Sequence, residues 1–185
     1  MRRFLFIAFL SLFSANVFSQ IASDKFDKDG SRIIISKQRP ASFTIKRAVN
    51  FRLIDIVSVN NADSYYIILN IVGNKKREAE YTKGRKLLIK LNDDSIIELS
   101  VFKTLEDDDY QGYGAYVRYA VNEDEIERMI KNEVLKLRIE NDFDYIDVNI
   151  KKNMFSKSLK TLYEAIKEQR KIEKKSGDEG LYEGF

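Results

Sequence analysis

The side chains of this chain that could do chemistry are carboxylates, tyrosines, serines, threonines and basic residues, because its 185 residues include no histidine and no cysteine. Without these two residue types, no Ser-His-Asp or Cys-His nucleophile can form, and zinc sites built from them are excluded as well. Catalysis would have to rest on paired carboxylates, as in glycoside hydrolysis, where two carboxyl groups flank the scissile bond.

The densest group of carboxylates is Glu106 to Asp109, which opens the stretch EDDDYQGYGAYVRY. Four adjacent carboxylates do not all point at one ion unless the backbone coils, and no second cluster of ligands accompanies them. They are equally weak candidates for an acid–base pair, since the two carboxylates of such a pair must face each other across a sugar. Charge runs of this length are usually solvated loops, so we predict an exposed connection, with weak calcium binding by Asp107–Asp109 as the alternative.

A second acidic motif, DKFDKDGSRIII, places Asp27, Asp29 and Gly30 at the third, fifth and sixth positions of an EF-hand loop. However, Lys25 and Ser36 occupy the first and twelfth positions, where calcium needs a carboxylate and a bidentate glutamate. Residues typical of strands follow in place of a helix, so we predict a polar turn before the first strand. The sequence therefore assigns no catalytic residue, metal ligand or cofactor.

Tyrosines recur every three residues after the acidic run, but a strand splits them between two faces, because successive side chains alternate. Tyr113, Val117 and Tyr119 share one face and are predicted to be core residues. Tyr116 and Arg118 share the opposite face, where an aromatic side chain beside an arginine suits a contact surface. Tyr116 and Arg118 are therefore the candidate ligand-binding residues.

Asp55 interrupts the otherwise apolar face that Phe51, Leu53 and Val57 form on a predicted strand. A buried carboxylate with a raised pKa would be a candidate functional group. A bulge or an edge position that lets the side chain reach water is more common, and this is the interpretation we favour.

The elements that must position these residues have the pattern of short strands, since apolar and polar residues alternate between turn residues. Nine strands are predicted, at 32–36, 42–47, 51–59, 64–72, 85–91, 95–103, 112–121, 134–140 and 143–150. The segment 64–72 is apolar on both faces, which predicts an interior strand that is covered on both sides.

The register of one hairpin follows from its apolar faces, because a slip by one residue would turn every side chain over. In this hairpin Ile89 is predicted to face Leu99, with a three-residue loop at 93–95. The same register sets Lys90 opposite Glu98 on the outer face.

The register of the last hairpin follows in the same way. Its apolar face sets Leu135, Leu137 and Ile139 against Ile150, Val148 and Ile146. This register brings Arg138 opposite Asp147 on the outer face, where such a pair contributes about 0.2–1 kcal/mol.

Two helices interrupt the strands. The segment VNEDEIERMIKN has Asn122 as N-cap and Glu125 three residues later, which predicts a capping box and a short connector helix. Residues 155–174 repeat apolar side chains at helical spacing, which predicts a longer helix that packs on a sheet.

These elements predict a mainly β domain of two packed antiparallel sheets, as a sandwich or an open barrel, with a short connector helix and a C-terminal helix. The alternative is an α+β roll, in which a single curved sheet has both helices on one side. In this division 1–19 is a signal peptide, 20–175 is a single β-rich domain and 176–185 is a flexible tail.

The N-terminal segment has the composition of a secretory signal peptide. Arg2 and Arg3 precede the apolar run Phe4–Phe13, and a mostly small or polar exit leads to cleavage near Ser19. The apolar run is short for a bilayer crossing, and no later segment resembles a stable membrane span. We therefore expect an exported protein, periplasmic or extracellular, and the lack of cysteine excludes the lipid anchor of a lipoprotein.

The charge balance argues against nucleic acid as a partner. The chain has 32 basic and 29 acidic residues, and without Arg2 and Arg3 the mature chain has 30 against 29. A nucleic-acid-binding domain normally shows a clear basic excess on one face. The absence of tryptophan also argues against a dedicated carbohydrate-binding face.

Three segments carry a resemblance: DGSRIII, KLLIKLNDDSIIEL and YAVNEDEIERMIKNEVLKLRIE, followed by a lysine-rich terminal helix. With these segments in this order and a leader that ends in FSQ, the chain resembles a group of exported proteins of Bacteroides-like gut bacteria that have no assigned activity. The resemblance covers most of the mature chain, and its motifs are patterns of strand and helix. It implies export and architecture, and it carries over no catalytic residue.

The sequence therefore predicts an exported, non-enzymatic β-rich module that binds or scaffolds a protein or glycan partner. This prediction rests on the lack of a nucleophile, a phosphate-binding loop or a convincing carboxylate pair. The rival class is a carboxylate-dependent hydrolase acting on glycans, which would require two carboxylates that face each other across a deep cleft.

Overall fold

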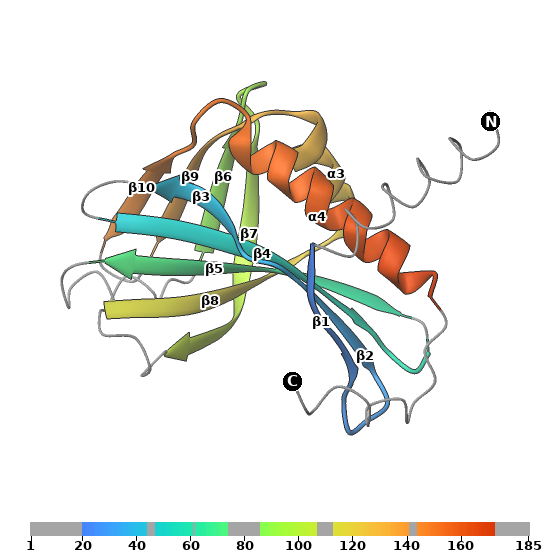
Figure 1. The fold of residues 1–185 in the computed structure, drawn as a ribbon. Helices are drawn as coiled ribbons and strands as arrows, with labels where there is room; N and C mark the ends of the chain where they lie inside the picture. Colours follow the sequence, from blue (N-terminus) through green and yellow to red (C-terminus); the bar gives the residue numbers. More distant parts are fainter. Residues whose placement is uncertain are drawn as a thin grey trace, which may run out of the picture.

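A computed structural model describes most of the predicted domain (Figure 1). The described residues are 20–43, 47–60, 62–73, 86–106, 113–140 and 144–172. Three predictions fall outside the described residues: the signal peptide, the tail, and the alternative of weak calcium binding by Asp107–Asp109.

The described part of the chain forms ten strands and two helices. The strands are β1 (Ile21–Phe26), β2 (Arg32–Ser36), β3 (Arg39–Phe43), β4 (Arg47–Val57), β5 (Asp63–Gly73), β6 (Lys86–Leu91), β7 (Ile96–Glu106), β8 (Tyr113–Val121), β9 (Val134–Glu140) and β10 (Tyr145–Asn149). The helices are α3 (Glu123–Lys131) and α4 (Met154–Arg170).

All strand pairs are antiparallel and belong to one open sheet, in the order β1-β2-β4-β5-β8-β7-β6-β9-β10, with β3 also paired to β4. Strand β7 is shared between the two halves of this sheet: residues 96–100 pair with β6, and the rest of the strand pairs with β8. A bulge between Val101 and Lys103 lies where the partner changes, and bulges bend a strand.

The sheet therefore folds into two leaves that share one core (Figure 1). We call β1 to β5 with β8 the lower leaf, and β6, β9 and β10 the upper leaf. The predicted mainly β fold with a connector helix and a C-terminal helix is confirmed, and its open-barrel form fits the folded sheet. The two sheets are continuous through β7, because this strand is long enough, at 11 residues, to pair in both leaves.

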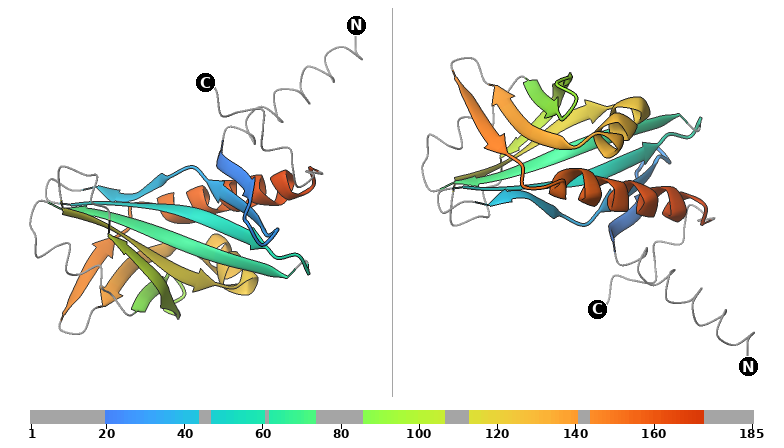
Figure 2. Two further views of the ribbon diagram at one scale, coloured as in Figure 1. Left: turned by 90° about the horizontal axis from the view of Figure 1, so that it is seen from below. Right: turned by 90° about the horizontal axis from the view of Figure 1, so that it is seen from above.

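Helix α4 closes the open side of the folded sheet and packs on the lower leaf (Figure 2). The Phe155 ring stacks on the Phe51 ring of β4 with ring centroids 4.2 Å apart. Leu159, Leu162 and Ile166 continue the same buried face at helical spacing. The apolar stripe that predicted this helix is therefore its contact with the sheet.

Helix α3 begins with the predicted capping box. The Glu125 amide donates to Asn122 Oδ1 at 2.8 Å, and the Asn122 amide donates to Glu125 Oε2 at 2.9 Å. The two side chains satisfy amides that the first helical turn leaves without partners. The helix then packs against α4, so the connector helix and the C-terminal helix support each other.

Strands β2 and β9 have their predicted bounds, whereas β1 was not predicted, because its acidic and basic residues resemble a turn. The polar turn lies between β1 and β2, so it is a hairpin turn and does not precede the first strand. The Ser31 amide donates to Asp29 Oδ1 at 2.8 Å, and Gly30 has a φ of 82°, which suits glycine.

The register of β9 and β10 is confirmed, with Arg138 opposite Asp147. The Arg138 guanidinium donates to both Asp147 oxygens, at 2.7 and 3.0 Å. The predicted inward position of Leu135 is wrong. A register shift on β9 pairs Val134 with Leu91, so Val134 is buried and Leu135 is 40% exposed.

The register of β6 and β7 differs from the prediction by two residues, because Ile89 faces Ile97. Asp94 takes a left-handed φ of 62°, which closes the loop one residue earlier than predicted. A slip of two residues keeps every side chain on its face, so the core is unchanged. The salt bridge of Glu98 is formed with Lys86, at 2.6 Å, and not with the predicted lysine.

Candidate functional site

Polar side chains from β4, β5 and α4 meet on the inner face of the lower leaf. We call Asp55, Asp63, Tyr65 and Arg170 the α4 cluster. Arg170 Nε lies 3.0 Å from Asp55 Oδ2, and a terminal nitrogen of the same guanidinium contacts Asp63. Arg170 also donates to the Tyr65 hydroxyl at 3.1 Å. One guanidinium of α4 therefore holds groups of two neighbouring strands.

Asp55 is fully buried, which corrects the prediction that a bulge or an edge lets it reach water. It lies inside β4 in regular register between Ile34 and Tyr65, and its exposed fraction is 0%. Burial raises the pKa of Asp55 to about 6 against the opposing charge of Arg170, and the charge of Asp63 raises it further. Neither carboxylate oxygen has a hydrogen-bond partner among the described residues, so the contact with Arg170 is an ion pair without hydrogen-bond geometry.

A neighbouring set of polar side chains fixes the C-terminal end of α4. Arg32 donates to the two carboxylate oxygens of Asp24 at 3.0 and 2.8 Å. It also donates to the carbonyls of Gln169 and Ile172, at 3.0 Å each, which satisfies groups that a helix end leaves open. Gln169 Nε2 donates to Asp24 at 2.7 Å. These residues attach α4 to β1 and β2, which is a structural role.

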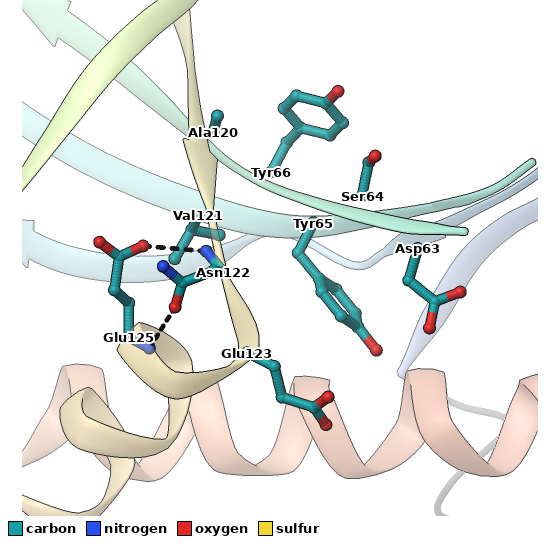
Figure 3. A pocket seen from close by; sticks show the side chains of 9 residues that line it. All are labelled: Asp63, Ser64, Tyr65, Tyr66, Ala120, Val121, Asn122, Glu123 and Glu125. Carbon is teal, nitrogen blue, oxygen red and sulfur yellow. Dashed lines mark hydrogen bonds between the residues drawn. The ribbon is translucent and has the colours of Figure 1, made fainter.

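Two hollows flank the α4 cluster. One, of about 450 Å³, is lined by residues of β5, β8 and α3, and Tyr65 and Tyr66 point to opposite sides of β5 beside it (Figure 3). The other, of about 510 Å³, lies against Arg32, Arg170 and the turn that joins β1 to β2. Asp55 lines neither of these two hollows, so its carboxylate is out of reach of a molecule bound in them.

Figure 3 shows three carboxylates around the first hollow, and each of them already has a partner. Glu125 belongs to the capping box of α3. Glu123 accepts from the Tyr163 hydroxyl and from Lys167 Nζ, the latter at 3.1 Å, and Asp63 pairs within the α4 cluster. A glycosidase needs two carboxylates that flank the scissile bond. This hollow offers no such pair.

The alternation predicted for β8 is confirmed. Val117 and Tyr119 are fully buried on the inner face, whereas Tyr116 and Arg118 lie on the outer face of the lower leaf. The side chain of Tyr113 lies outside the described residues. Seen from below, the strands of the lower leaf pass in front of α4, so this helix does not cover their outer face (Figure 2, left).

Large side chains from four strands surround Ile68 on this outer face. We call Arg52, Tyr66, Phe102, Tyr116 and Arg118 the outer patch. The Arg52 guanidinium lies 5.4 Å from the centre of the Tyr116 ring, and the Arg118 guanidinium lies 5.7 Å from that of Tyr66. The Tyr66 and Phe102 rings are 4.9 Å apart, and Phe102 is 58% exposed. These distances suit cation–π and aromatic contacts.

Sequence reasoning identified two residues of the outer patch and missed Arg52, Tyr66 and Phe102. The missed residues belong to β4, β5 and β7, and only strand pairing brings them beside β8. The sequence signal that could have pointed to them is the apolar character of both faces of β5. β5 lies inside the sheet as predicted, but in the described part of the chain no helix or strand packs on its outer face.

The outer faces of the two leaves differ in charge. Among the described side chains, the outer face of the lower leaf has no carboxylate, because Asp24, Asp55 and Asp63 of its strands point toward α4. On the upper leaf, acids and bases form pairs: Lys136 and Arg138 with Asp147, and Lys86 with Glu98. The upper leaf therefore has an ordinary solvated face, whereas the lower leaf presents arginine and aromatic groups.

The described ranges contain neither a cluster of possible metal ligands nor a helix suited to cross a membrane. No three Asp or Glu side chains of these ranges gather closely enough to hold a metal ion. Neither α3 nor α4, the two helices of the described part, combines the length and apolar composition that a membrane crossing needs.

No protein-family model matches the chain, and no curated protein and no solved structure is similar enough to match it. The α4 cluster and the outer patch are therefore the features from which a function can be inferred.

Proposed function

We propose that the protein is an exported, non-enzymatic binding module that contacts its partner through the outer patch. The observation that carries this proposal is the series of stacked arginine and aromatic side chains on a sheet face that no described helix or strand covers. Arginine and aromatic residues are enriched in protein interfaces and in the positions that contribute most binding energy. Because these side chains point away from the core, packing of the core does not account for their gathering.

Export is supported by the N-terminal segment. Arg2 and Arg3, the apolar run Phe4–Phe13 and the exit that follows are typical of a secretory signal peptide. The resemblance to exported proteins points to the same location, in the periplasm or outside the cell.

The alternative, a carboxylate-dependent glycan hydrolase, has less support. A general acid or base must come within hydrogen-bond reach of its substrate. Asp55 has a suitable pKa but is fully buried, and it shares Arg170 with Asp63. The two carboxylates are therefore joined by a guanidinium and do not face each other across a cleft.

The proposal is tested by differential capture. Immobilised wild-type protein and a Phe102→Ala/Tyr116→Ala variant are exposed to envelope extract and culture medium of the source cells, and retained molecules are quantified. The matched control is Tyr145→Ala, which removes a 51% exposed tyrosine that stacks on Arg138 of the upper leaf, with its guanidinium 4.0 Å from the ring centre.

We expect a partner that wild type and Tyr145→Ala retain and that the Phe102→Ala/Tyr116→Ala variant loses. Circular dichroism must show that all three proteins are folded. Equal retention by all three proteins would refute the outer patch as the contact surface. Release of sugars from a panel of polysaccharides, abolished by Asp63→Asn, would establish the hydrolase instead.

A further inference from the structure

The two arginines of the outer patch lie in one row across the sheet. Arg52 of β4 and Arg118 of β8 both pair with Ile68 of β5, from opposite sides. Neighbouring strands are about 4.8 Å apart, so the two Cα atoms are about 10 Å apart. The sheet therefore places the backbone of one arginine on each side of an apolar residue.

Neither guanidinium has a carboxylate partner among the described residues. Arg52 donates to Gln38 Oε1 at 3.1 Å and lies over Tyr116. Arg118 lies over Tyr66, and its buried Nε has no hydrogen-bond partner. By contrast, Arg32, Arg138 and Arg170 each pair with a carboxylate. A guanidinium that has no carboxylate partner keeps its capacity for charge-assisted hydrogen bonds, so a partner that supplies carboxylate oxygens would be favoured here.

The remainder of the patch is apolar and aromatic. Ile54 and Ile68 are buried beneath it, and Phe102 is exposed at its rim. Anionic polysaccharides and anionic membranes are bound mainly by clusters of basic side chains, and the patch has only two among its described members. A mixture of apolar, aromatic and arginine side chains is typical of the centre of a protein interface.

We infer that the outer patch binds an acidic segment of a partner protein, in which two carboxylates flank an apolar side chain. This inference rests on the proposed function and adds the chemistry of the partner. A helix with acidic residues seven positions apart is one such segment, because it sets them on one face about 10.5 Å apart, which is close to the separation of the two arginine Cα atoms. The two carboxylates then pair with Arg52 and Arg118, and the apolar side chain lies over Ile68.

The inference is tested with defined probes. One probe is a helical peptide with glutamates seven residues apart and leucines between them. A control peptide has the same sequence with glutamine in place of every glutamate. Heparin and phosphatidylglycerol vesicles serve as an anionic polysaccharide and an anionic membrane. Affinity is measured by calorimetry for the wild type, for Arg52→Gln/Arg118→Gln and for the charge-matched control Lys131→Gln/Lys157→Gln, whose lysines are exposed on α3 and α4.

The wild type and the control are expected to bind the glutamate peptide, and Arg52→Gln/Arg118→Gln should bind it at least about tenfold more weakly. The glutamine peptide should bind the wild type as weakly as the glutamate peptide binds Arg52→Gln/Arg118→Gln. Added salt should weaken binding of the glutamate peptide to the wild type. Equal binding of the two peptides, no binding of either, or an equal loss in the control would overturn the inference. So would tighter, arginine-dependent binding of heparin or of the vesicles.

The two proposals fail in distinguishable ways. If the capture experiment finds a partner that depends on Phe102 and Tyr116 but Arg52→Gln/Arg118→Gln retains it, the contact surface stands and the acidic partner is refuted. If capture does not depend on Phe102 and Tyr116, the proposed function fails as well.

Discussion

Replacement of Asp55 by asparagine should change how the stability of the protein depends on pH. Burial raises the folded-state pKa of Asp55 from 3.8 to about 6. A carboxyl group whose pKa rises on folding stabilises the folded state fully below its unfolded pKa, and this contribution is lost as the pH rises through the folded pKa. Asparagine does not titrate, so the variant lacks this loss.

The size of the effect follows from the shift. A change from 3.8 to about 6 corresponds to about 3 kcal/mol in full. The wild type loses about 1.4 kcal/mol of this stabilisation as the pH rises from 5 to 7.5. Over that range the difference in free energy of unfolding between Asp55→Asn and wild type should therefore move by about 1.4 kcal/mol in favour of the variant. Any difference between protonated aspartic acid and asparagine adds only a constant offset.

The assay is urea denaturation at several pH values, followed by circular dichroism because the chain has no tryptophan. The matched control is Asp147→Asn. The hydrogen bond from Arg138 lowers the pKa of Asp147 to about 2, so its contribution is present above pH 3.8 and is lost as the pH falls toward 2. Between pH 5 and pH 7.5 the control difference should stay constant.

A constant difference between Asp55→Asn and wild type over this range would mean that the pKa of Asp55 is not raised, and the argument from burial would be refuted. If the charge of Arg170 outweighed burial, the pKa of Asp55 would lie below 3.8, and the difference would change only as the pH falls below that value.

Two further substitutions test the fold, both by the free energy of unfolding in urea. Phe155→Ala removes the ring that stacks on Phe51 and should lower this free energy by about 3–5 kcal/mol; a loss below about 1 kcal/mol would show that α4 is not part of the core. Asn122→Ala removes the N-cap of α3 and should lower it by about 1 kcal/mol. An unchanged value for Asn122→Ala would contradict the capping box.

Features that depend on neighbouring residues were predictable from the sequence. Alternation of apolar and polar side chains gave the bounds of β2 and β9, and it separated Tyr116 and Arg118 from the buried Tyr119. The capping box of α3 was predictable for the same reason, because both hydrogen bonds join residues three apart. Steric alternation and helix capping act over a few residues, so a short segment contains all that they need.

Features that depend on backbone irregularities were not predictable. The left-handed Asp94 moved the register of β6 and β7 by two residues, and a shift in β9 exchanged Leu135 for Val134 on the inner face. The bulge after Val101 lets β7 pair in both leaves. Apolar alternation fixes the face of a side chain but not the position of a loop or a bend, because neighbouring registers two residues apart bury the same faces.

The environment of the candidate functional groups came from tertiary structure alone. Asp55 is buried because the strands beside it and Arg170 of α4 enclose it, and its pKa is raised for that reason. Arg52 and Arg118 lie in one row only because β5 pairs with both β4 and β8. Burial, charge pairing and cross-strand contact depend on which distant segments pack together, whereas the sequence pattern of one strand reports only which of its side chains share a face.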